Sequence, residues 1–578
     1  MASDVKIGLV GSGGDGVVAA GDIIVHAMAS CGLYAMMMKS FGPQIRGGES
    51  SARIRLSSEK VYSLGDGLDT LVVMNWGDYL KFAGELELND NAILIVDEKD
   101  NTRPDDSLKL QKVASIVEVP ITSLAESSKN PKGKNMVVLG ILAGMFGLSE
   151  GALVSAIQKR FAHKGEGVVS TNVTSFNAGF KYAKSNIPPS HLSLQASHIG
   201  KRLVITGNEA IALGALAAGC RFYSGYPITP ASEIMEWLGE KLPLYDGVMV
   251  QAEDEIAAIC MTIGASYGGV RAMTATSGPG LSLMMESIGL ASMAEIPCVI
   301  VDVQRGGPST GIPTKSEQAD LMQAVYGMHG DAPHAVIAVD DVETCFEVMA
   351  DAFEIAERYQ MPVIALSDQF IGHRTEVIVD PDLGKLKRGE RFIPQSGDTT
   401  SYKRFEDREN GVSPMSVPGM KGFDYICSGI EHDEFGSPSS SHVVHEKMCA
   451  KRARKLEHLR ANFKPIQVYG SSRPKVALIT WGSNSGVVRE AVERLVSLGI
   501  DAGVAVPRLI YPLQTSLFED FLKKAELLLV VENSYSGQFF RYLKSYIGMP
   551  DKAYSMRSSG AKIFMVKEVV SEVLKVLK

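Results

Sequence analysis

The stretch Arg271–Gly280, which reads RAMTATSGPG, has the pattern that decides the fold of the central part of the chain. A short apolar run is followed at once by a turn rich in glycine and proline, and an apolar helix pattern comes next. Similar units lie on both sides of it, with strand-like runs at 202–205, 221–224, 248–251, 298–301 and 362–366. Because short buried strands alternate with helices, we expect a parallel sheet covered by helices.

Two further segments with the same alternation flank this region. The first opens with a strand at Lys6–Val10, and the last begins at Lys475. A polar stretch after Pro188 is typical of a linker, and the region from Gly372 is rich in glycine, serine, proline and charge. We expect an ordered connector there, with disorder as the alternative. The sequence thus predicts a multidomain α/β protein of doubly wound sheets, divided as 1–187, 188–200 (linker), 201–371, 372–471 (connector) and 472–578.

Length and composition agree with such a protein. A chain of 578 residues is too long for one ordinary core, and 45% hydrophobic with 21% charged residues is typical of a globular protein. The formal net charge of −8 argues against a nucleic-acid partner, because phosphate binding needs clustered positive charge. We find no apolar stretch of the roughly 20 residues that span a bilayer and no signal peptide, so we expect a cytoplasmic protein without a membrane partner.

The seven cysteines are an odd number and include no C-x-x-C pair. This spacing argues against a disulfide framework, a zinc site or an iron–sulfur cluster held by this chain. We therefore expect no metal ligands here, and we interpret the cysteines as small apolar residues in a reducing compartment.

The turn Gly11–Gly16 could bind an anion, because glycines let the backbone approach a phosphate at a helix N-terminus. Gly13 and Gly14 are the candidate contacts. An NAD site would need an acidic residue after the second strand, where this sequence has Lys39 and Ser40. A tight turn without a ligand stays open, and so does a surface turn for the nearby glycine-rich loop around Arg46, which could clamp an anion.

Four strand ends of the central sheet carry residues that could form a site. These are Thr229 in the segment YPITP, Glu255 at the start of an apolar helix, Ser277 in the segment TSGPG, and Arg305 in the segment QRGGP. Open α/β sheets bind ligands at the carboxyl ends of their strands. Taken singly, each motif also fits an ordinary strand stop or helix cap, but together they predict a site for an anionic substrate and a heterocyclic cofactor.

These motifs resemble the 2-oxoacid:ferredoxin oxidoreductases over nearly the whole chain. The segments 226–230, 276–280 and 304–308 resemble the pyrimidine-binding domain of the family's α subunit. The first segment is similar to the γ subunit, fused in front of α, and the last is similar to the transketolase C-terminal domain. The stretch Glu431–Glu434, followed by a basic helix, resembles the 2-oxoglutarate branch.

The resemblance implies roles for single residues. Glu255 would hydrogen-bond the pyrimidine ring of thiamine diphosphate, since its spacing to Gly264 fits the family and that of the fallback Glu253 does not. Thr229 would contact the substrate, and Arg305 would bind its anionic group. The other implied cofactor contacts are Tyr226, Pro227, Ile228, Ser277 and Gly278 for thiamine diphosphate, and Gly13, Gly14 and Arg46 for coenzyme A. Asp15 departs from the γ pattern, because a carboxylate beside a phosphate would be repelled.

The resemblance also implies a partner. Gly65–Gly67, with Asn89 and Asn91 beyond, mimics a diphosphate and Mg²⁺ motif, but we interpret it as a turn. A separate β subunit is therefore expected to supply the diphosphate site, Mg²⁺ and a [4Fe–4S] cluster, and the chain would be active only with it, as a dimer of αβ heterodimers.

The implied reaction is the oxidative decarboxylation of 2-oxoglutarate with coenzyme A, which gives succinyl-CoA, CO₂ and reduced ferredoxin. Run backwards, it fixes CO₂ in a reductive TCA cycle. The alternatives are another 2-oxoacid, such as pyruvate or a branched-chain acid, an NAD(P)-dependent oxidoreductase, and a non-catalytic scaffold that binds coenzyme A.

Overall fold

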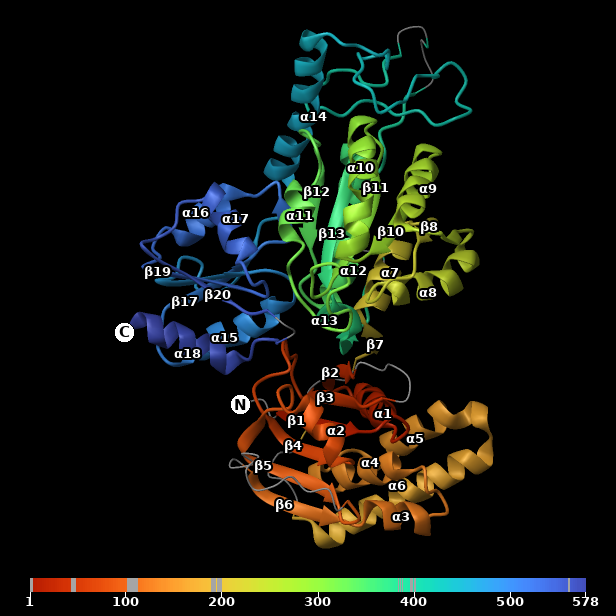
Figure 1. Cartoon of the computed structure of the whole chain (residues 1–578), viewed down its shortest axis with the longest axis vertical. Coiled ribbons are helices and arrows are strands. Elements are labelled where there is room, and N and C mark those ends of the chain that lie inside the picture. Colours follow the sequence, from red (N-terminus) through yellow and green to blue (C-terminus); the bar gives the residue numbers. More distant parts are fainter. Residues whose placement is uncertain are drawn as a thin grey trace. The chain divides into compact units, whose positions relative to one another are not determined.

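A computed structural model describes residues 4–42, 48–100, 113–188, 194, 200–382, 384, 386, 388–395, 399, 402–559 and 562–578. The chain divides into two compact units, labelled element by element in Figure 1. Unit 1 comprises Met1–Thr206, His373–Asp380 and Met565–Lys567, and unit 2 comprises Gly207–Gly372, Pro381–Phe564 and Glu568–Lys578. Among the described residues, no helix is both long and apolar enough to span a membrane.

Unit 1 is built on an eight-stranded mixed sheet with the order β6-β5-β4-β1-β3-β2-β14-β7. Its strands are β1 (Asp4–Gly11), β2 (Tyr34–Phe41), β3 (Ser50–Ser57), β4 (Leu68–Val73), β5 (Leu88–Asp97), β6 (Val113–Val119), β7 (Arg202–Thr206) and β14 (Thr375–Val379). Strand β1 runs parallel to β4 and antiparallel to β3. The second strand of the chain, β2, pairs antiparallel with β3, so it is not the parallel neighbour of β1 that an NAD-binding fold requires.

Helices cover both faces of this sheet. Leu9 and Val10 alternate between two apolar clusters, as adjacent strand residues do. The larger cluster includes α1 (Val17–Ser30), α3 (Ile121–Ser127), α4 (Lys134–Phe146), α5 (Glu150–Phe161) and α6 (Glu166–Asn186), and the smaller one includes α2 (Trp76–Phe82). A Cβ at Gly140 would lie 2.0 Å from the Phe176 carbonyl oxygen, so α4 and α6 approach closely because glycine stands there.

The first sheet of unit 2 has seven strands in the order β18-β12-β13-β11-β10-β8-β9. They are β8 (Phe222–Gly225), β9 (Val248–Gln251), β10 (Ala272–Thr276), β11 (Cys298–Gln304), β12 (Ala335–Ala338), β13 (Pro362–Asp368) and β18 (Leu509–Tyr511). All neighbours are parallel except β12 and β18. The accompanying helices are α7 (Gly207–Ala217), α8 (Ser232–Lys241), α9 (Glu255–Tyr267), α10 (Gly278–Met293), α11 (Leu321–Tyr326), α12 (Val342–Tyr359) and α13 (Gln369–His373).

The run at 202–205 differs from the sequence expectation, which placed it in this central sheet. As β7 it is instead the edge strand of the unit 1 sheet, paired antiparallel with β14. An apolar run of this length predicts a strand but carries no information about its partner, and only Ile205 of this run is buried.

The C-terminal sheet of unit 2 has five strands in the order β15-β17-β16-β19-β20. They are β15 (Gln467–Gly470), β16 (Val476–Thr480), β17 (Ala502–Val506), β19 (Leu527–Glu532) and β20 (Lys552–Arg557), with helices α15 (Ser485–Ser497), α16 (Thr515–Leu522), α17 (Gln538–Tyr546) and α18 (Val566–Leu577). Strand β18, from the same part of the chain, pairs with β12, and one apolar cluster includes residues such as Ile288 and Trp481. The two sheets of unit 2 therefore share a core.

The basic helix of the connector, α14 (His442–Asn462), is anchored by buried charges. The ammonium groups of Lys451 and Lys455 lie 2.6 and 2.5 Å from the carboxylate oxygens of Glu295. Arg404 donates to the Glu295 backbone carbonyl at 2.8 Å. The basic stretch at 451–455 therefore serves packing within unit 2, because two of its cations are paired with a buried carboxylate.

Candidate active site

The strand ends singled out in the sequence meet at one edge of the central sheet. The strands β11, β10, β8 and β9 are consecutive neighbours and run parallel, so their carboxyl ends share an edge. Arg305 follows β11, Ser277 follows β10, Thr229 lies in the loop after β8, and Glu255 lies after β9. This is the edge where open α/β sheets bind ligands.

Arg305 and Thr229 are in direct contact. The guanidinium Nη1 of Arg305 donates to the Thr229 backbone carbonyl at 2.5 Å. Arg305 is only 7% exposed, and its Nε is buried with no hydrogen-bond partner. Burial lowers the pKa of Arg305, while the charges of Asp320 and Glu255 act in the opposite direction. A fixed, partly unsatisfied guanidinium of this kind can hold an anion by charge-assisted hydrogen bonds.

Glu255 is the first residue of α9, and its neighbour caps the helix in its place. The Asp254 side chain accepts the Ala257 N–H at 2.7 Å, so Glu255 is not needed as the cap. Glu255 is 6% exposed, whereas Glu253 is exposed. The first turn of α10 packs against this carboxylate, because a Cβ at Gly280 would lie 2.7 Å from Glu255 Oε1. The structure thus separates the two carboxylates that the sequence left as first choice and fallback.

Two buried acids that the sequence analysis missed lie beside this edge. Asp302 on β11 is fully buried, with no partner for either carboxylate oxygen, and burial followed by the charge of Asp320 raises its pKa. Burial, with the charge of Glu317, raises the pKa of Asp320 to about 7, although Arg305 acts against the shift. A Cβ at Gly278 would lie 2.6 Å from an Asp320 oxygen, so this carboxyl touches the start of α10. The signal available was an acid inside the apolar run of β11, where unpaired acids are rare.

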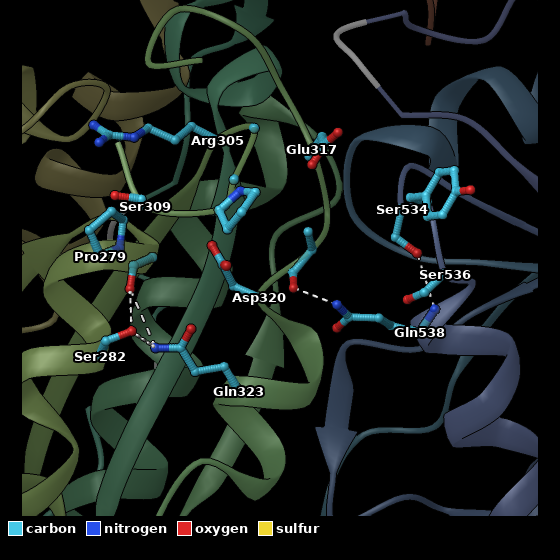
Figure 2. Close-up of a pocket in the computed structure, with 16 residues that line it drawn as sticks. Pro279, Ser282, Arg305, Ser309, Glu317, Asp320, Gln323, Ser534, Ser536 and Gln538 are labelled. Atoms are coloured by element: carbon cyan, nitrogen blue, oxygen red, sulfur yellow. Dashed lines mark hydrogen bonds between the residues drawn. The ribbon is translucent and has the colours of Figure 1, made fainter. Parts of the chain in front are cut away.

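A cavity of about 630 Å³ opens beside Arg305. Figure 2 shows its walls: the start of α10 and the Arg305 loop on one side, and the segment before α17 on the other. That second wall is tied to the first, because Gln538 Nε2 donates to the Ala319 carbonyl at 2.6 Å and its Oε1 accepts the Met322 N–H at 2.8 Å. Tyr535, also in this wall, is 82% exposed. Sequence reasoning gave no role to the residues of this wall, since nothing local marks them.

The remaining predicted contacts of this edge have different surroundings. Ser277 is fully buried and its hydroxyl has no hydrogen-bond partner, so it can serve a ligand group. Gly278 lines the cavity. Tyr226 is 41% exposed, Pro227 is exposed and Ile228 is half-buried, and the cavity lining does not include them. The unpartnered hydroxyl and the close approach at Gly280 fit the polar edge of a pyrimidine ring beside Glu255.

The glycine turn of unit 1 is filled by its own side chain. The Asp15 carboxylate accepts the Ser12 N–H at 2.8 Å, and the Ser12 hydroxyl donates to Asp78 at 2.5 Å. Burial raises the pKa of Asp15, with the Ser12 hydrogen bond acting against it. Gly14 has a φ of 105°, a backbone conformation that favours glycine, and a Cβ there would meet no atom within 4 Å. The surroundings of Gly13 and Gly14 therefore include an internal carboxylate, and Arg46 lies outside the described residues.

The Gly65–Gly67 segment has the contacts of a turn. The Asp66 carboxylate accepts the Lys567 N–H at 2.8 Å. Asn89 Nδ2 donates to Asp69 Oδ1 at 2.7 Å instead of facing Asp66. These bonds support the interpretation of this stretch as a structural element.

Comparison with known proteins gives matches along the whole chain. Residues 213–451 match the family described as pyruvate flavodoxin/ferredoxin oxidoreductase, thiamine diphosphate-binding, and residues 6–182 match pyruvate ferredoxin/flavodoxin oxidoreductase. Residues 468–539 match the transketolase C-terminal domain. The 2-oxoacid:ferredoxin oxidoreductase subunit alpha of Saccharolobus solfataricus is 31% identical, over 98% of this chain and 96% of its own length. The chain belongs to the 2-oxoacid:ferredoxin oxidoreductase family.

Two further members of the family are similar to it. The 2-oxoglutarate synthase subunit KorA of Methanothermobacter marburgensis is 37% identical, over 64% of this chain and 98% of its own length. A solved 2-oxoglutarate:ferredoxin oxidoreductase from Magnetococcus marinus, with 2-oxoglutarate, coenzyme A and succinyl-CoA bound, covers 100% of both chains with a TM-score of 0.94 and 36% identity.

As a 2-oxoacid:ferredoxin oxidoreductase, the chain is an oxidoreductase with the predicted α/β fold. The strand-end residues lie inside its thiamine diphosphate-binding domain. Relatives named as α subunits indicate that it works with a partner subunit, and the family name indicates ferredoxin. Membership in this family displaces the NAD(P)-dependent and scaffold alternatives.

Proposed function

We propose that this chain is the α subunit, with a fused γ-type domain, of a 2-oxoglutarate:ferredoxin oxidoreductase. The observation that carries the proposal is the convergence of a buried Glu255, a buried Arg305 and Thr229 at one sheet edge beside a cavity of about 630 Å³. The bound 2-oxoglutarate, coenzyme A and succinyl-CoA of the similar Magnetococcus enzyme support this choice of substrate and products.

Glu255 would hold the pyrimidine ring of thiamine diphosphate. When bound, this cofactor supplies the carbon that attacks the 2-oxo group and the ring system that accepts the electron pair of decarboxylation. Our chain's part is to fix one tautomer of the pyrimidine by a hydrogen bond from a carboxyl that lies in a dry pocket. The Ser277 hydroxyl is the second group there able to bond the ring.

Arg305 would hold the substrate's anionic group. Its contact with the Thr229 carbonyl fixes the guanidinium, and its unpartnered Nε leaves donor capacity for a carboxylate. The buried Asp302 and Asp320 lie near this cation and the start of α10. A proton held on this pair lowers the local negative charge, which favours the entry of an anion.

The rest of the assembly belongs to the same proposal. A β subunit supplies the diphosphate site, Mg²⁺ and a [4Fe–4S] cluster, and two αβ heterodimers associate. Gly13, Gly14 and Arg46 of the γ-type domain are proposed contacts of coenzyme A, and running the reaction towards CO₂ fixation stays a proposal, as does the cytoplasmic location. The division at 187, 200, 371 and 471 stays a proposal too, with β7 joined to the first sheet as noted above.

The test is viologen reduction by the chain co-purified with its partner, with coenzyme A present and 2-oxoglutarate compared with pyruvate and a branched-chain 2-oxoacid. We expect reduction with 2-oxoglutarate. Reduction with another 2-oxoacid alone would keep the family chemistry and overturn the substrate. No reduction with any of them, from a preparation shown to contain thiamine and iron, would overturn the proposed activity.

A further inference from the structure

Three side chains of metal-binding type lie together at the start of α14, apart from the active-site edge. They are Glu431, His445 and Cys449, and each offers one ligand atom within 4.8 Å of the others. Carboxylate oxygen, imidazole nitrogen and thiolate sulfur are the three ligand types that proteins use for zinc. The sequence gave no sign of this cluster, because Glu431 is distant along the chain and the cysteine spacing fits no known ligand pattern.

The fold brings the three together for simple geometric reasons. His445 and Cys449 are four residues apart in α14, so they lie on the same face of the helix. Glu431 comes from the preceding loop, whose shape is fixed by the Ser439 N–H bonded to the Glu431 carbonyl at 2.9 Å. Arg452, one turn further along α14, donates from Nη1 and Nη2 to the two Glu431 oxygens at 3.2 and 3.0 Å. The carboxylate is therefore oriented before any ligand arrives.

The distances are close to those of a site that needs only a cation. Cys449 Sγ lies 3.7 Å from His445 Nε2 and 3.8 Å from Nδ1. Ligand atoms about 2.0–2.3 Å from a tetrahedral zinc ion lie roughly 3.3–3.8 Å apart. His445 Nδ1 and Glu431 Oε2 are closer, at 2.5 Å, because they share a hydrogen bond. The His445 side chain is 63% exposed, so its ring can turn to open that bond.

The charges around the cluster leave one side open to a cation. Arg452 is the positive group in contact with Glu431, and it is buried, with 4% of its side chain exposed. His445 lies on the exposed side. A cation from solvent therefore approaches from the side opposite the guanidinium. One carboxylate and one thiolate neutralise a dication, and Arg452 then acts as the group that orients the ligand carboxylate.

We propose that Glu431, His445 and Cys449 bind a divalent, thiophilic cation of the Zn²⁺ class, with the fourth position open to water. Binding forms one bond each to oxygen, nitrogen and sulfur. The thiol proton of Cys449 and the proton between His445 and Glu431 go to solvent. The cation would clamp the first turns of α14 to the loop at Glu431, and this site is independent of the proposed reaction.

The experiment uses the full chain, stripped with a chelator and kept in a phosphine reductant, with Co²⁺ as the probe. Thiolate ligation gives a charge-transfer band in the near ultraviolet. We expect this band to saturate at one equivalent of Co²⁺ and to disappear when Zn²⁺ is added. Absence of a saturable band in the wild-type chain would overturn the proposal.

Four variants assign the ligands. Cys449→Ser is expected to abolish the band, and His445→Gln to weaken Co²⁺ binding by more than about tenfold, since even outer-shell changes cost that much. Cys260→Ser, which alters another exposed thiol, and His442→Gln, on the same helix, are the matched controls and are expected to bind as the wild type does. A band that survives in Cys449→Ser would overturn the proposal. His445→Gln changes a surface side chain, so it stays informative if the cysteine variant fails to fold.

Discussion

Two turns of this molecule have the same sequence plan and different contents. The turn after β1 and the turn after β10 both follow a buried strand and both open a helix. In the first, the Asp15 carboxylate accepts the Ser12 N–H. In the second, the Ser277 hydroxyl is buried without a partner, and the start of α10 packs against the carboxylates of Glu255 and Asp320. Glycine after a strand therefore permits a ligand, while the neighbouring side chains decide whether room and donors remain for one.

The largest expected effect comes from removing the carboxylate at the second turn. Glu255→Gln should lower kcat by about 10²–10⁴-fold, the usual contribution of a positioned acid or base. Viologen reduction by the complex with its partner measures this. Glu253→Gln, which alters the exposed carboxylate of the same segment, is the control and should keep full activity. Equal losses in both variants would remove the distinction between the two residues.

The next effect concerns the cation at this edge. Arg305→Lys keeps the charge but loses the fixed fork that bonds the Thr229 carbonyl. A charge-assisted hydrogen bond contributes about 1.5–3 kcal/mol, so kcat/KM for the 2-oxoacid should fall by roughly 10–150-fold. The KM for coenzyme A, measured in the same assay, should stay unchanged. A twofold or smaller change in kcat/KM would contradict an anion-binding role.

The buried acid at the second turn predicts a pH dependence of stability. Burial raises the pKa of Asp320 to about 7, so the folded chain binds a proton there that the unfolded chain has already lost. Stability from this group is therefore present at low pH and is lost as the pH rises from about 4 towards 7, with a slope of up to about 1.4 kcal/mol per pH unit. Asp320→Asn should flatten this slope, which thermal unfolding at a series of pH values measures. An unchanged slope would show that Asp320 does not carry the proton.

The smallest effect is expected at the first turn. Asp15→Ala removes the side chain that accepts the Ser12 N–H. The loss of one such hydrogen bond should lower the free energy of unfolding by about 1 kcal/mol, with kcat at saturating coenzyme A unchanged. Denaturant unfolding and the viologen assay measure the two quantities. A tenfold fall in kcat would mean that this turn, too, serves the reaction directly.

The part of the site that follows the chain locally could be predicted from the sequence. Strand ends in one parallel sheet must share an edge, so Thr229, Glu255 and Arg305 could be grouped without coordinates. The choice between Glu253 and Glu255 needed the resemblance, because only the fold shows that Asp254 caps α9. The second wall of the cavity could not be predicted, since it depends on how Gln538 meets the Ala319 carbonyl from a distant segment.

Sheet membership was the main part of the fold beyond the reach of the sequence. The pairing of β7 with β14 joins residues on both sides of the central sheet, and no local pattern encodes a partner at that distance. The cluster of Glu431, His445 and Cys449 is of the same kind, because its loop and its helix meet only in three dimensions.

The pairing of β7 and β14 has a consequence for biosynthesis. The segment from Gly207 to Gly372 is inserted between two strands of the first sheet. During translation β2 must therefore wait for its neighbour β14 until residue 379 has left the ribosome, and the inserted segment emerges first. An exposed strand edge is a template for pairing with other chains. The nascent protein is thus most vulnerable to aggregation, and most in need of a chaperone, while its central sheet is being made.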